Sequence, residues 1–80
     1  MNTKRKAETI VGKIRRALNA TVDFYVNDKG QEIVIVIKMN EFYSVYKYYV
    51  EFKTLEACTT QGITKDILKL AINRIIRDVA

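Results

Sequence analysis

An 80-residue chain with a net charge of +5 makes one domain, residues 1–80, and its hydrophobic share of 49% excludes a disordered chain. The absence of histidine and the single cysteine, Cys58, exclude imidazole-based catalysis, an ordinary zinc site and an internal disulfide. No stretch reaches about 20 apolar residues and no apolar segment follows the basic start, so we expect no membrane span, no signal peptide and a cytoplasmic location.

The first expected element is an amphipathic helix over residues 4–20, with Thr3 as its N-cap. Apolar residues at three- and four-residue spacing form one stripe: Ala7, Ile10, Val11, Ile14, Ala17 and Leu18. At about 100° per residue, four cations share the opposite, exposed face: Arg5, Lys6, Lys13 and Arg16.

The excess positive charge is concentrated in this first segment. Residues 1–21 carry a net charge of +5, residues 22–61 carry −2 and residues 62–80 carry +2. Such asymmetry favours an anionic partner, and the alternative is a solvated helix face. The four helix cations are therefore candidate partner-binding residues.

Three strands follow the first helix. Residues 22–27 alternate between apolar and polar positions, residues 31–39 are rich in Ile and Val, and residues 42–53 are rich in aromatic residues. The first two strands are joined by a turn in which Gly30 is free to take a positive φ. The short connections predict antiparallel pairing.

A second amphipathic helix is expected over residues 65–79, with Thr64 as its N-cap. Its expected core stripe is Leu68, Ala71, Ile72, Ile75, Ile76 and Val79, and Ile67 and Leu70 lie off this stripe. Two alternatives remain for residues 54–62, a loop or a short helical turn capped by Thr54.

The order α-β-β-β-α predicts an α+β fold in which a three-stranded antiparallel sheet carries both helices on one face. Helices on both faces, or sheet pairing in a dimer, are the alternatives. With both helices on one face, strand alternation sends a set of tyrosines and valines to the other face. This set, a candidate partner-binding surface, comprises Tyr25, Val34, Val36, Tyr43, Val45, Lys47 and Tyr49, with Lys38 and Lys53 beside it.

Monomers seldom leave such an apolar area exposed, so we expect it to be covered by a second copy of the chain, by another protein or by stacked bases. If instead one helix packs on each face, all these residues belong to the core. A bulge in the long third strand would also change which residues share a face.

No catalytic constellation is present. Cys58 has no histidine to activate its thiol, and we expect that thiol to be buried or incidental. The carboxylates are scattered without an acid/base pair, and the three glycines form no phosphate-binding loop. We therefore expect no enzyme activity, no metal, no cofactor and no small-molecule substrate.

Two functions remain. The element order resembles that of double-stranded RNA-binding domains over nearly the whole chain, which implies nucleic-acid binding by the basic helix and the Tyr/Lys face. The resemblance is one of topology: there is no histidine, and Gly62-Ile63-Thr64-Lys65-Asp66 offers one lysine beside an acid where that family is rich in lysine.

The favoured function is a non-catalytic protein-binding module, because tyrosine and arginine are the residue types enriched at interface hot spots. In its size, its lack of catalytic motifs and its Ile-, Lys-, Asn- and Tyr-rich composition, the chain resembles small inhibitors encoded by phages and mobile elements, anti-CRISPR proteins among them. We expect an inhibitor or regulator of a protein complex. The target complex can be one that handles nucleic acid. It would bind a protein partner or form a homodimer.

Overall fold

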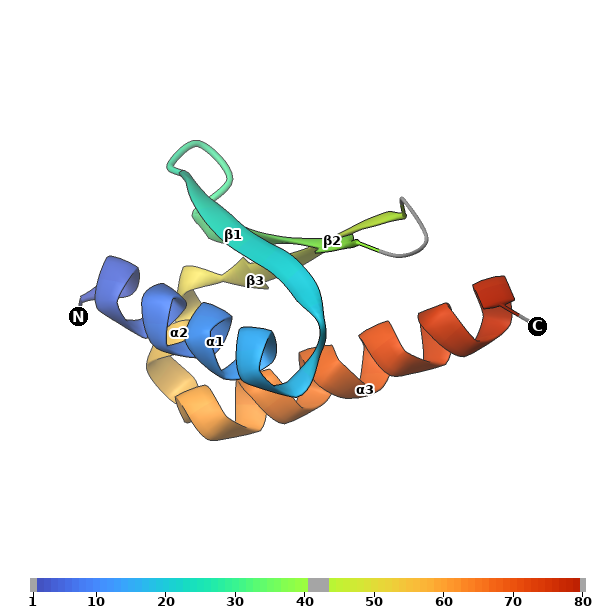
Figure 1. Cartoon of the computed structure of the whole chain (residues 1–80). Helices are drawn as coiled ribbons and strands as arrows, with labels where there is room; N and C mark the ends of the chain where they lie inside the picture. Colours follow the sequence, from blue (N-terminus) through green and yellow to red (C-terminus); the bar gives the residue numbers. More distant parts are fainter. Residues whose placement is uncertain (1, 41–43, 80) are drawn as a thin grey trace.

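The computed structural model of the chain describes residues 2–40 and 44–79. Its elements follow the order α1 (Thr3–Ala17), β1 (Ala20–Asn27), β2 (Glu32–Met39), β3 (Val45–Glu51), α2 (Phe52–Ala57) and α3 (Thr60–Val79). The strands form one antiparallel sheet in the order β1-β2-β3, and all the helices lie in a second layer on one side of it (Figure 1). The predicted α+β fold class is confirmed, and of the two alternatives for residues 54–62 the short helix is the one observed, as α2.

The sheet register sorts the strand residues cleanly between two faces. Ile35 of β2 lies opposite Phe24 and Tyr48, and this row faces the helices. Within the described residues no bulge interrupts the β1–β2 or the β2–β3 ladder, so side chains two residues apart share a face along each strand. The inner rows contribute Val22, Ile33, Ile35, Ile37, Met39, Tyr46 and Val50 to the core.

α1 packs on this inner face through the predicted apolar stripe. Ala7, Ile10 and Ile14 are fully buried and Val11 nearly so. The helix begins one residue earlier than predicted and ends three residues earlier, because residues 20 and 21 belong to β1. Its N-cap is Asn2, whose Oδ1 accepts a 3.0 Å hydrogen bond from the Arg5 N–H, and Thr3 lies inside the helix.

The predicted third strand over residues 42–53 is too long at its C-terminal end. Phe52 has the alternating position of a strand residue but begins α2, a six-residue helix that turns the chain under the sheet and buries Leu55. Glu51, and not Thr54, lies at the N-cap position of α2. Phe42 and Tyr43 lie outside the described residues.

α3 begins five residues before its predicted start. Thr59 caps it, since its Oγ1 accepts a 3.0 Å hydrogen bond from the Gly62 N–H. The predicted cap, Thr64, is a buried residue within the helix, and its hydroxyl donates to the Thr60 carbonyl.

The core face of α3 is also rotated relative to the prediction. Ile67, expected off the stripe, is buried with Ile63 and Ala71, whereas Ile72 and Ile76 are exposed. The helix carries two apolar stripes, and the one that begins at Ile63 reaches the sheet because the helix starts early enough to include it.

The β1–β2 turn places its unusual backbone at Gln31, with φ of 52°, and not at Gly30. The Gln31 carbonyl accepts a 2.8 Å hydrogen bond from the Phe52 N–H, so this turn is joined to the beginning of α2. The left-handed conformation of a non-glycine residue is therefore held by a tertiary contact.

Candidate functional site

The outer face of the sheet is the main candidate surface. The described helices all lie on the other side, so no described element covers it (Figure 1). Its central row runs Tyr25–Val34–Tyr49 across the three strands. Tyr25 is 49% exposed and Tyr49 is 61% exposed, while Val34 between them is only 1% exposed. The two tyrosine side chains thus shield the valine and present their own surfaces to a partner.

Mixed polar and apolar rows flank the tyrosine row. The next row is Asp23–Val36–Lys47, with Val36 half-buried. Beyond it Lys38 lies opposite Val45, which is exposed. On the other side of the tyrosine row lie three polar residues, Asn27, Glu32 and Glu51. The outer face therefore has an aromatic centre with both signs of charge around it.

The structure places most of the predicted outer-face residues together. Six of the seven share this face: Tyr25, Val34, Val36, Val45, Lys47 and Tyr49. The seventh, Tyr43, lies outside the described residues. Lys53, expected beside them, belongs to α2, and its ammonium group lies 3.3 Å from the Glu51 carboxylate.

The basic face of α1 is less uniform than its sequence pattern. Arg5 and Arg16 are exposed. Lys6 is half-buried, and its Nζ donates a 2.7 Å hydrogen bond to the Leu55 carbonyl of α2. Lys13 is half-buried as well. Lys6 thus has a structural contact that the helical periodicity did not indicate.

The two predicted binding surfaces lie on opposite sides of the molecule. α1 lies in the helical layer and packs its buried stripe against the inner face of the sheet, whereas the tyrosine row lies on the outer face (Figure 1). One flat partner surface therefore cannot contact both.

Arg15 makes a structural contact at the sheet edge that sequence reasoning missed. Its Nε and Nη2 donate hydrogen bonds of 3.0 and 2.6 Å to the Val22 carbonyl, and its Nη2 lies 3.6 Å from the Asp23 carboxylate. In the observed ladder the Val22 carbonyl points away from β2, so Arg15 occupies the free edge of β1. A charged side chain at this place discourages pairing with another strand.

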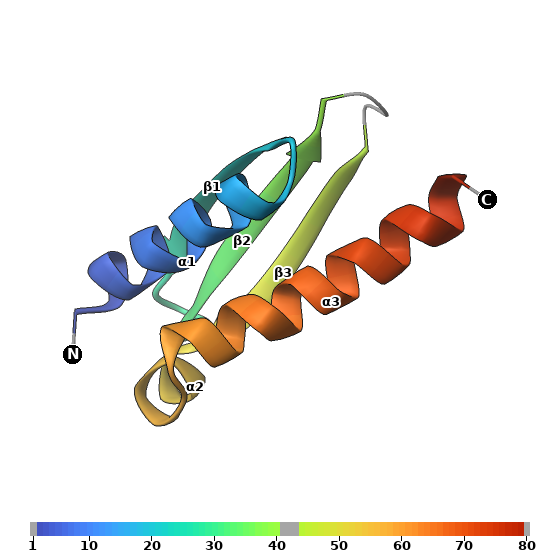
Figure 2. The same ribbon diagram turned by 60° about the horizontal axis from the view of Figure 1, so that its bottom comes forward.

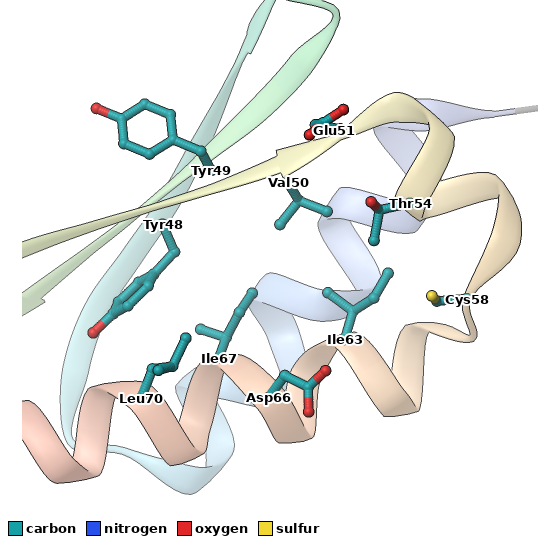
Figure 3. A pocket seen from close by; sticks show the side chains of 10 residues that line it. All are labelled: Tyr48, Tyr49, Val50, Glu51, Thr54, Cys58, Ile63, Asp66, Ile67 and Leu70. Carbon is teal, nitrogen blue, oxygen red and sulfur yellow. The ribbon is translucent and has the colours of Figure 1, made fainter.

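A groove between β3 and α3 is the second feature that sequence reasoning missed. One hollow of about 250 Å³ is lined by apolar side chains of both elements, including Val50, Ile67 and Leu70, and also by Cys58, which is exposed. Tyr48 and Val50 point from β3 toward α3, whereas Tyr49 points to the other side (Figure 3). A second hollow of about 400 Å³ continues along β3 and is lined by Val45, Tyr46, Lys47, Tyr48 and Arg74.

Two tyrosines of this groove have raised pKa values. The Tyr46 hydroxyl donates a hydrogen bond to the Asp78 carboxylate, and this bond, together with burial, raises the pKa of Tyr46. Burial raises the pKa of Tyr48, although the positive charge of Arg74 acts in the opposite direction. Both phenols are therefore neutral hydrogen-bonding groups at physiological pH.

Within residues 2–40 and 44–79, no three His, Cys, Asp or Glu residues gather in a way that could hold a metal ion. In the same part of the chain no helix combines the length and the apolar character needed to cross a membrane.

No family model matches the chain, and comparison with curated proteins and with solved structures found no match either. Its function must therefore be inferred from the geometry.

Proposed function

We propose that the chain is a non-catalytic protein-binding module that contacts its partner through the outer face of the sheet. The observation that carries this proposal is the uncovered Tyr25–Val34–Tyr49 row. Tyrosines give large contact area at low entropic cost, and their hydroxyls can bond a partner at the rim of an apolar contact. Inhibition or regulation of the partner is the role we expect of such binding.

The mixed charges around the tyrosine row also favour a protein partner. Asp23 and Glu51 are exposed on this face together with Lys38 and Lys47. A platform that stacks bases combines aromatic side chains with a positively charged path for the backbone, and carboxylates on the same face oppose it. The nucleic-acid alternative then depends on α1 alone, where Lys6 is already bonded to Leu55.

The test is site-specific photo-crosslinking in cells that naturally express the chain. A photoreactive amino acid at Tyr25 or Tyr49 should join the chain to a discrete partner, and the same group at Asn73, an exposed residue of α3, should not. The Tyr25→Ser, Tyr49→Ser double variant should still unfold cooperatively, at a lower midpoint because Val34 loses its shielding, and should lose the partner. Retention of every interaction by a folded double variant would contradict the proposal.

Fluorescence anisotropy with labelled DNA and RNA over a salt series distinguishes the nucleic-acid alternative from the protein-binding function. Phosphate contacts by α1 would give binding that weakens steeply with salt and that Arg5→Glu with Arg16→Glu reduces. We expect no such binding at low salt.

A further inference from the structure

The free edge of β3 and the adjacent side of α3 together form a groove of the kind that accepts an added strand. We propose that an extended segment of a partner protein binds in this groove as a fourth strand, antiparallel to β3. This inference rests on the proposed function and deepens it by naming the form of the partner. It concerns the edge of the sheet, whereas the proposed function concerns the outer face.

The backbone of β3 supplies one wall of the groove. The Met39 N–H donates to the Ser44 carbonyl, which makes these two residues a hydrogen-bonded pair of the β2–β3 ladder. Because such pairs alternate along an antiparallel ladder, the N–H and C=O groups of Val45, Lys47 and Tyr49 point away from β2. Within the described part of the chain, these outward groups have no hydrogen-bond partner. They form an unpaired row onto which a strand can add.

α3 supplies the floor. It lies in the layer below the sheet and runs beside β3, beyond the edge of the sheet, with its C-terminal half diverging from it (Figures 1 and 2). A strand added to β3 would therefore lie above α3, where the two hollows share Tyr48. Its inward side chains would enter the hollow lined by Val50, Ile67 and Leu70. Leu70 is 57% exposed, and burial against such a strand would cover it.

Charges at the two ends of the groove determine which end of an antiparallel segment is basic and which is acidic. Glu51 and Asp66 line the end nearer α2, and Lys47 and Arg74 line the other end. A strand antiparallel to β3 enters beside Glu51 and leaves beside Lys47. The complementary segment therefore has a basic residue first, alternating apolar residues next and an acidic residue last.

A second copy of the chain fits this edge less well than a single strand does. In a symmetric dimer that pairs β3 with the antiparallel β3 of a second copy, the two-fold axis is perpendicular to the joined sheet. The helical layers of both copies therefore lie on the same side of that sheet. It would bring a second α3 into the layer beneath the edge, where the first α3 already lies (Figure 2). A segment without a helix beneath it avoids that overlap.

The test uses two blocked peptides of one composition, Lys-Val-Thr-Val-Asp and the reversed Asp-Val-Thr-Val-Lys, titrated into the ¹⁵N-labelled full chain and followed by NMR. The first should shift and protect the amides of Lys47 and Tyr49, and the second should bind at least fivefold more weakly. Absence of these shifts at millimolar peptide, or equal binding of both peptides, would overturn the proposal.

Two variants locate the binding. Tyr49→Pro removes one outward N–H and spares the β2 ladder, and it should weaken the first peptide at least tenfold. Leu70→Asp in the groove should do the same, while Ile76→Asp, equally exposed on α3 at 60%, should not. The Leu70 and Ile76 pair keeps the test valid if the proline variant does not fold. Equal effects of the two aspartate variants would count against the groove.

Sedimentation of the free chain tests the occupant. A dimer that Leu70→Asp dissociates and Tyr25→Ser does not would show a second copy on this edge and overturn the choice of a separate partner. The outer face is tested separately, because Tyr25→Ser changes the tyrosine row without touching the groove. Peptide binding that survives Tyr25→Ser but not Leu70→Asp would support the groove even if the outer face had no role.

Discussion

The Tyr46 hydroxyl donates a 2.7 Å hydrogen bond to the Asp78 carboxylate and so joins the beginning of β3 to the last turn of α3. The Arg74 guanidinium lies 5.7 Å from the centre of the same ring. Residues 32 positions apart in the sequence thereby hold the diverging half of α3 against the sheet. Tyr46 and Arg74 both line the hollow at the basic end of the groove.

We predict an alkaline loss of stability that depends on Tyr46. The pKa of Tyr46 is raised in the folded protein above its value near 10 in the unfolded chain. At a pH between these two pKa values the phenol keeps its proton in the folded state and has lost it in the unfolded state. The stabilising contribution is complete below about pH 10 and is lost as the pH rises through the folded pKa. Urea unfolding across this range should show a decline that is less steep in Tyr46→Phe. Asp78→Asn should behave similarly, and an unchanged slope in both variants would refute the link.

The rotated core face of α3 predicts unequal costs for two isoleucines of the same helix. Ile67 is almost fully buried and Ile76 is largely exposed. Ile67→Ala should lower the free energy of unfolding by about 2–5 kcal/mol because it leaves a cavity, while Ile76→Ala should change it by less than about 0.5 kcal/mol. Chemical denaturation of both variants is sufficient, and the reverse order would restore the stripe expected from the sequence.

Arg15 should stabilise the fold more than its neighbour Arg16. Arg15→Ala removes the two hydrogen bonds to the Val22 carbonyl and should lower the free energy of unfolding by about 1 kcal/mol. The loss is smaller than for hydrogen bonds of a buried side chain because the Arg15 side chain is partly exposed. Arg16→Ala should be neutral within about 0.5 kcal/mol. The variants are compared by thermal and urea unfolding. Faster aggregation of Arg15→Ala alone would show in addition that Arg15 protects the edge of β1.

The bond between Lys6 and Leu55 predicts a structural role for one of the four cations on α1. Lys6→Ala should lower the free energy of unfolding by about 1 kcal/mol, because the Leu55 carbonyl loses its donor. Lys13→Ala is the matched control on the same helix and should be close to neutral. Equal and negligible effects, measured by urea unfolding, would mean that the Lys6 bond contributes nothing and that all four cations are free for a partner.

The outer face could be predicted from the sequence because side-chain alternation has a period of two. Once Ile33, Ile35 and Ile37 are placed in the core, Val34 and Val36 must point the other way. The short turns leave little choice of register, so Tyr25 and Tyr49 follow onto the same row. The end of β3 at Phe52 carries no signal of this kind, because alternation continues through that residue.

The groove could not be predicted, since it depends on where α3 lies relative to β3. The sequence of α3 offers two apolar stripes, and the stripe with Leu68, Ile72 and Ile76 is the richer in large side chains. The core is contacted through Ile63, Ile67 and Ala71 instead. Ile63 belongs to the helix because Thr59 caps it early, and this residue extends the second stripe by one turn. Which stripe faces the core is decided by packing against the other elements, and the sequence of the helix alone does not contain that information.

The two edges of the sheet differ in how readily they accept another strand. At β1 the charged Arg15 side chain lies on the outward Val22 carbonyl, whereas the outward backbone groups of Val45, Lys47 and Tyr49 on β3 have no hydrogen-bond partner in the described part of the chain. A growing fibre needs both edges of every molecule, so a charge at one edge opposes the polymerisation to which strands rich in Ile, Val and Tyr are prone.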